Sequence, residues 1–89
     1  MKIDYTVQVW GRGTRYIAHA MPLDMASAGD TPEGARQAVD EAVRSFLDTA
    51  SEDGTLEEVL QEAGYPREGG SWQAPEWLGV EQRSYLAAA

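Results

Sequence analysis

The sequence contains no cysteine, one histidine (His19) and one lysine (Lys2). The lack of cysteine excludes disulfides, thiolate metal sites and thiol catalysis. A single histidine is too few for a histidine-rich zinc site. The longest apolar stretches span only a few residues, which excludes a transmembrane helix. Residues 1–5 alternate in polarity and do not form the apolar run of a signal peptide, so we expect a cytoplasmic protein.

The chain has 89 residues and a mass of 9.7 kDa, which predicts one domain over residues 1–89. Leu, Ile, Val and Phe together account for only 15 residues, a low share for a folded protein. Three Trp and four Tyr argue against disorder, because disordered chains contain few aromatic residues. We therefore expect a small folded domain with a thin core.

The formal net charge is −8, and its placement is uneven. Residues 30–62 hold ten acidic residues and two arginines, whereas the charges of the remaining chain sum to zero. Such a segment is either a solvated helix surface that keeps the protein soluble or a surface that attracts a basic partner. In the second case Asp40, Glu41 and Asp48 are the candidate steering residues. Direct binding of nucleic acid is not expected, because it requires clustered lysine and arginine.

Three strands are predicted in the first third of the chain. Residues 3–9 alternate between apolar and polar side chains, which is typical of a half-buried strand. The turn sequence Gly11-Arg12-Gly13 predicts an antiparallel return over residues 14–21, which Pro22 ends. A third short strand is expected over residues 25–28.

Two helices and a final strand are predicted in the remainder. Thr31-Pro32-Glu33 is a helix start, with Thr as the N-cap and Pro at the first position, and Gly54 ends this long amphipathic helix. Thr55-Leu56-Glu57-Glu58 has the pattern of a capping box and predicts a short helix over residues 55–64. After a loop, the pattern of residues 76–86 predicts a C-terminal strand.

This β-β-β-α-α-β order predicts a two-layer α+β fold, with one long amphipathic helix packed on one face of an antiparallel sheet. Because alanine allows a helix to approach closely, we place the face with Tyr16, Ala18 and Ala20 beneath the helix. The other face would then be an interface for a partner or a second copy. Its candidate residues, together with two aromatics of the last strand, are Arg15, Ile17, His19, Met21, Trp77 and Tyr85. The alternative is that the faces are reversed and that Ile17 and Met21 are core residues.

No pattern in the sequence reaches the standard of a catalytic, cofactor or metal site. Asp4 and Asp24 are the only acidic residues in the sheet region, whereas a metal-dependent nuclease needs several converging carboxylates. The glycines of Gly11-Arg12-Gly13 lack the strand-to-helix context of a phosphate-binding loop. We therefore expect no enzyme and no cofactor; the enzymatic alternative would require a metal ion at Asp4 or Asp24.

A family resemblance rests on motifs within residues 3–50. They are an aromatic-x-Ala strand, a proline-containing turn and a Gly-Asp-Thr-x-Glu entry into a long helix: Tyr16-Ile17-Ala18, Pro22-Leu23 and the run from Ser27 to Ala35. This pattern resembles the HicB-like antitoxin domain. The resemblance implies a truncated RNase-H-like fold without catalytic carboxylates. It also implies a protein that neutralises a small basic ribonuclease toxin by direct binding, often as a dimer or larger oligomer.

Residues 65–89 are too short and too neutral for the DNA-binding module that full-length members of that family carry, so the sequence is similar to a stand-alone HicB-like domain. Two functional hypotheses follow. In the first, the protein is an antitoxin, or an antitoxin-derived binding protein, that occludes a basic toxin. In the second, it is an orphan domain that associates with itself as an oligomeric scaffold or regulatory module.

Overall fold

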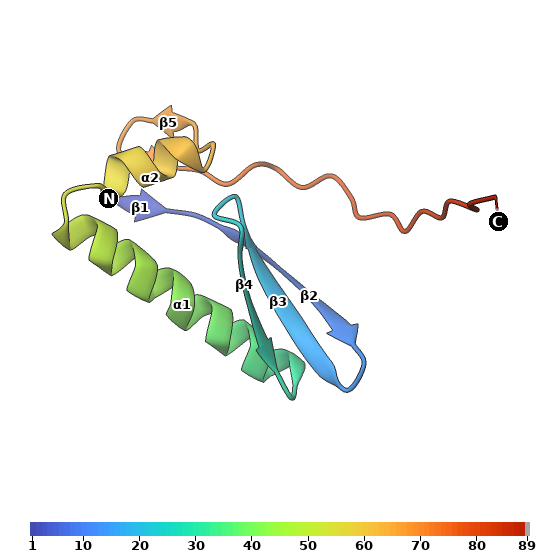
Figure 1. The fold of residues 1–89 in the computed structure, drawn as a ribbon. Helices are drawn as coiled ribbons and strands as arrows, with labels where there is room; N and C mark the ends of the chain where they lie inside the picture. Colours follow the sequence, from blue (N-terminus) through green and yellow to red (C-terminus); the bar gives the residue numbers. More distant parts are fainter. Residues whose placement is uncertain (89) are drawn as a thin grey trace.

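One long helix lies across a three-stranded antiparallel sheet in the computed structural model, which describes residues 1–88 (Figure 1). The sheet has the order β2-β3-β4, and the helix α1 follows it directly. The bounds are β2 Thr6–Arg12, β3 Arg15–Met21, β4 Met25–Gly29 and α1 Pro32–Glu52. The predicted α+β class, the antiparallel sheet and the two helices are confirmed.

A second, smaller group of elements lies at one end of α1 (Figure 1). It contains the helix α2 and a small three-stranded sheet of order β1-β6-β5, in which β1 and β6 are parallel. The bounds are β1 Lys2–Ile3, α2 Leu56–Glu62, β5 Arg67–Glu68 and β6 Ser71–Trp72. The sequence did not predict this small sheet, because it joins residues about seventy positions apart.

The predicted first strand over residues 3–9 is divided in two. Ile3 pairs with Trp72 in the small sheet, and the amide of Asp4 donates a hydrogen bond to the Trp72 carbonyl at 2.9 Å. The chain therefore leaves one sheet at residues 4–5 and enters the other at Thr6. The predicted hairpin that follows is confirmed. The antiparallel pairing of β2 with β3 continues as far as Arg12 and Arg15, and in the turn between them Gly13 has φ +63°.

The start of α1 has the predicted local chemistry. The amide of Gly34 donates a hydrogen bond to the Thr31 hydroxyl at 2.9 Å, and Pro32 occupies the first helical position, where its missing N–H costs nothing. From there the helix buries one stripe against the sheet, formed by Ala35, Val39 and Val43. Helical spacing of the apolar residues therefore predicted the correct face.

The main core confirms which face of the sheet lies beneath α1. Ala18 and Ala20 are fully buried in one cluster with the apolar stripe of the helix. Tyr16 is partly buried against the same cluster. Small side chains at the two alanines allow α1 to lie close to β3, as expected. The alternative with reversed faces is excluded, since Ile17 and Met21 belong to neither of the two core clusters.

The short helix α2 packs onto a second core cluster of Leu60, Tyr65 and Trp72. The predicted helix over 55–64 is confirmed, but the predicted capping box is wrong, because Thr55 makes no side-chain cap. Its hydroxyl instead donates to the Ala50 carbonyl at 3.4 Å, so it serves the end of the preceding helix. The tight connection between the two helices sets this geometry.

The predicted C-terminal strand over 76–86 is absent, which corrects the sequence-based assignment. Residues 73–88 form neither helix nor strand and extend away from the folded part (Figure 1). The Cα radius of gyration is 15.5 Å, whereas a compact chain of this length has one of about 12 Å. An alternating pattern makes a strand possible, but a strand forms only where another strand pairs with it.

No helix within residues 1–88 is long and apolar enough to cross a membrane.

Candidate functional site

The sheet face opposite α1 is not covered by any helix or strand of the described chain. We call it the open face and define it by the side chains of the three strands that point away from the helix: Thr6, Gln8, Trp10, Arg12, Arg15, Ile17, His19, Met21, Ala26 and Ala28. Trp10 pairs with Ile17 and Gln8 pairs with His19 across the antiparallel ladder. Side chains on one face of such a ladder stand side by side, so the predicted residues of β3 share one surface.

Trp10 is the most prominent apolar side chain of the open face, with 44% of its surface exposed. Its ring meets the His19 ring edge-on, with centroids 6.2 Å apart and an angle of 69° between the planes. Exposed aromatic residues of this kind are enriched in protein interfaces, because they bury a large area on binding. The open face therefore has an aromatic centre rimmed by polar groups.

His19 has a partner that the sequence analysis missed. Its Nε2 lies 2.6 Å from Oδ1 of Asp24, which sits in the turn between β3 and β4 with φ +59°. The one indication of this contact in the sequence is that His19 and Asp24 are five residues apart, on either side of the predicted end of a strand. This pair has no nucleophile beside it, since Ser27 faces the helix side of the sheet opposite Ala18. We assign it to holding the turn and orienting the imidazole.

The two carboxylates at which the enzymatic alternative would place a metal ion, Asp4 or Asp24, have different partners. Asp24 is engaged with His19, while Asp4 lies beside β1 with the Lys2 ammonium 3.8 Å away. Within residues 1–88, no three His, Asp or Glu side chains come together in a way that could hold a metal ion.

The predicted steering residues on α1 differ in their surroundings. Asp40 is half-buried and accepts a hydrogen bond from the Tyr5 hydroxyl at 2.7 Å, whereas Glu41 and Asp48 are exposed. A shallow depression of about 470 Å³ runs along the first part of this helix surface, between acidic and basic side chains. Because Arg36 pairs with Glu33 there, this part of the surface carries little excess charge.

The acidic excess is concentrated further along, where the end of α1 meets α2. Residues 45–62 contain six acidic residues and no basic one, and all six are exposed: Asp48, Glu52, Asp53, Glu57, Glu58 and Glu62. We call this set the acidic end. Acidic residues at a helix C-terminus oppose the helix dipole, so Glu52 and Asp53 destabilise the isolated helix slightly. A cation bound there would relieve this repulsion.

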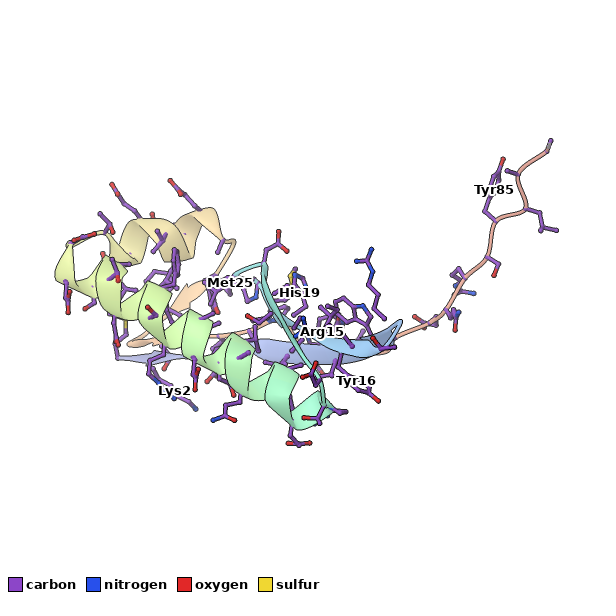
Figure 2. The ribbon with its side chains drawn as sticks, turned by 60° about the horizontal axis from the view of Figure 1, so that its bottom comes forward. Lys2, Arg15, Tyr16, His19, Met25 and Tyr85 are labelled. Carbon is purple, nitrogen blue, oxygen red and sulfur yellow. The ribbon has the colours of Figure 1, made fainter. Side chains whose placement is uncertain are left out.

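Of the two aromatics predicted for the last strand, Tyr85 lies away from the open face. Trp77 and Tyr85 belong to the extended segment 73–88, and Figure 2 shows Tyr85 far from the sheet that carries Arg15 and His19. The open face therefore carries the four predicted β3 residues without Tyr85. Trp10 of β2, which pairs with Ile17 and faces the same side, is the main addition.

Two tyrosines, the half-buried Tyr5 and the buried Tyr65, fix the junction between the two sheets. The Tyr65 hydroxyl donates to the Asp4 carbonyl at 2.7 Å, and Tyr5 donates to Asp40 as described. Burial of each phenol disfavours its charged form and raises the pKa of both tyrosines to about 12. These groups are structural, because their hydroxyls are already engaged with protein acceptors.

Comparison with known proteins adds no relative. No protein-family model matches the chain, and neither the curated proteins nor the solved structures contain a chain with significant similarity to it.

Proposed function

We propose that this chain is a stand-alone HicB-like antitoxin domain, or a binding domain derived from one, that occludes a small basic ribonuclease toxin. The proposal includes the truncated RNase-H-like identity of the fold and a cytoplasmic location, where such a toxin would meet RNA. It rests on the sequence motifs of residues 3–50 and on the distribution of charge and apolar surface.

The observation that carries the proposal is the separation of two surfaces. The acidic end gathers six exposed carboxylates without a basic residue, and the open face presents Trp10 and Ile17 on the side of the sheet away from α1. Complementary charge accelerates the encounter with a basic protein, whereas an aromatic, partly apolar patch stabilises the bound state. A binding protein of this kind uses both surfaces, and neither surface requires a catalytic residue.

In this mechanism the chain acts only by covering the toxin. The acidic end attracts lysine and arginine side chains that the toxin would otherwise use to hold RNA phosphates. The open face then fixes the orientation, with Ile17 of the central strand and Trp10 of the outer strand β2 buried and Arg15 at the rim. RNA is excluded because the chain occupies the same basic surface.

The test is inhibition of RNA cleavage by the small basic protein encoded beside this chain's gene. The two proteins are expressed together, purified, and compared with the basic protein alone. We expect one equivalent of the chain to abolish cleavage. Undiminished cleavage at excess chain, or the lack of any such basic ribonuclease at the locus, would contradict the proposal.

A matched pair of variants separates steering from general charge. Replacing Glu52 and Glu58 by Gln should slow association several-fold at low salt, because the steering field weakens. Replacing Glu76 and Glu81 by Gln, in the extended segment, should leave the association rate nearly unchanged. Equal slowing in both variants would show that only net charge matters.

The second candidate function is an oligomeric scaffold without a toxin. It is favoured by the exposed apolar character of the open face, where Ile17 and Met21 would contact another copy. Apolar contact resists salt, whereas binding through the acidic end weakens as salt screens the charges. An oligomer that persists in high salt and binds no basic protein would support this function over the first.

A further inference from the structure

The extended C-terminal segment, residues 73–88, exposes a cluster of large apolar side chains. We call it the C-terminal arm. Its exposed fractions are 90% for Leu78, 79% for Val80, 89% for Tyr85 and 95% for Leu86. Single exposed apolar residues are common on protein surfaces, but four within nine positions of one extended segment form an apolar strip, interrupted by Gly79 and by the polar residues 81–84. Within one copy this strip has no cover, since the far end of the arm lies clear of the sheet in both views (Figures 1 and 2).

The arm has the pattern of a strand that is covered on both faces. Leu78, Val80 and Leu86 occupy even-numbered positions, whereas Trp77 and Tyr85 occupy odd-numbered ones. In an extended strand these sets point to opposite sides. A strand at the surface of a sheet has one polar side, whereas apolar residues on both sides are typical of a strand packed on two faces.

The edge of β2 offers such a double-sided site. β2 is an outer strand of its sheet, and residues 6–12 pair only with β3 among the described residues. The helix α1 packs mainly over β4 and β3 and least over β2. Val7 and Val9 are therefore only half-buried although they face the helix side, and Trp10 is exposed on the other side. A strand beside β2 would find apolar surface on both of its faces.

The geometry points to an exchange of C-terminal arms between two copies of this chain. Each arm adds as a strand to the free edge of β2 in the other copy, as in strand addition to a sheet edge. Leu78 and Val80 lie on the helix side, beside Val7 and Val9. With Leu78 opposite Val9 in an antiparallel pairing, Trp77 lies next to Trp10 on the open-face side, whereas Tyr85 lies on the same side about 26 Å further along the arm. The two-fold arrangement closes on itself and leaves no further arm free.

The distribution of charge explains why two copies, each with a net charge of −8, can meet at this edge. Strand β2 contains no acidic residue and carries Arg12, and the arm between residues 73 and 88 has two acidic residues and one basic residue. The excess acid of each copy lies on its helices, away from the contact. The inference concerns the chain alone and holds whether or not a basic partner exists.

The first test is the oligomeric state of the full chain. Light scattering at micromolar concentration should give twice the mass of one chain. Because the two-fold dimer loses four apolar side chains, two from each arm, Leu78→Ser combined with Val80→Ser should raise the dimer dissociation constant roughly ten-thousandfold. Gln82→Ser, in the same arm, should leave it within about twofold. A monomeric wild-type chain, or equal loss in the Gln82→Ser control, would overturn the inference.

A second measurement separates exchange from other contacts. The chain has no cysteine, so Gln8→Cys in one sample and Gly79→Cys in another each introduce a unique thiol, at positions that face each other in the exchanged pairing. Mixing the two samples, one with an added mass tag, should yield a disulfide-linked pair of both variants on oxidation. Cross-linking within one chain that carries both substitutions, with none in the mixture, would show that the arm folds onto its own sheet and would overturn the exchange.

Pairing through the open face is the remaining arrangement to exclude. Ile17→Ser removes an apolar side chain at the centre of that face but leaves the edge of β2 and the arm intact. We expect its dimer dissociation constant to stay within about threefold of wild type. Loss of the dimer in Ile17→Ser equal to that in the arm variant would assign the contact to the open face instead.

Discussion

Replacing Gly29 by alanine should strongly destabilise the protein, because the strand end and the helix start touch at this point. A Cβ at Gly29 would lie 2.5 Å from the Ala35 nitrogen, 2.8 Å from the Gly34 carbonyl carbon and 3.1 Å from the Ala35 Cα. All three are backbone atoms, so no side-chain rotation can relieve the clash. Either β4 or the first turn of α1 must move.

The size of the effect follows from the cost of overpacking. Forcing extra atoms into a packed contact costs about 1–3 kcal/mol, and the fixed backbone places this case at the upper end. A domain of 89 residues has a total stability of about 4–13 kcal/mol. In a domain of this size 1 kcal/mol shifts the melting temperature by about 4–8 °C. We therefore expect a loss of about 10–20 °C.

Urea denaturation and thermal melting, followed by circular dichroism, measure this loss. Gly70→Ala is the matched control, because no atom lies within 4 Å of a Cβ at that position and its φ is not in the left-handed region. The control should melt within about 2 °C of wild type. A Gly29→Ala variant as stable as the control would refute the close packing of α1 on β4.

Three further predictions follow from individual contacts. Thr31→Ala removes the acceptor for the Gly34 amide and should cost about 1 kcal/mol in urea denaturation, whereas Thr31→Ser should cost little. Leu60→Ala removes a fully buried side chain from the centre of the second core cluster. In the same assay it should lower the free energy of unfolding by about 2–5 kcal/mol. A loss below about 1 kcal/mol would refute that packing. Tyr5 and Tyr65 have folded-state pKa values of about 12 against 10.0 for the free phenol, so their contribution to stability is complete below pH 10 and lost as the pH rises towards 12. Denaturation midpoints across this window, with Tyr65→Phe as a variant that loses less stability there, measure the effect; a flat profile would contradict it.

Local chemistry explains which elements the sequence predicted well. Thr31 and Pro32 determine where α1 begins through one hydrogen bond and one fixed dihedral angle, and both act within a single turn. The alternation that puts Ala18 and Ala20 on one face of β3 likewise needs only neighbouring residues. These features were predictable because their causes lie within a few positions of each other.

Long-range pairing explains what the sequence did not predict. The split of the first strand depends on Ile3 meeting Trp72, and no local signal reports that contact. The strand expected over residues 76–86 failed for the converse reason, because its pattern is present but no strand pairs with it in one copy. Thr55 shows a smaller case, in which a capping pattern is overridden by the nearby end of α1.

The candidate site was predicted in part for the same reasons. Ile17, His19 and Met21 share the open face because strand alternation fixes their side. The contact of His19 with Asp24 depends on the turn geometry after β3, and the concentration of charge at the acidic end depends on how α2 follows α1. Turn geometry and helix arrangement are tertiary features that spacing alone does not specify.

The most direct test of the proposed function is an NMR titration of the isotope-labelled chain with the basic protein encoded beside its gene. The account predicts that the resonances of Trp10, Ile17 and His19 shift or broaden together, and that added salt weakens the binding. Shifts confined to the C-terminal arm, or no shift at equimolar basic protein, would contradict the claim that the open face binds such a partner.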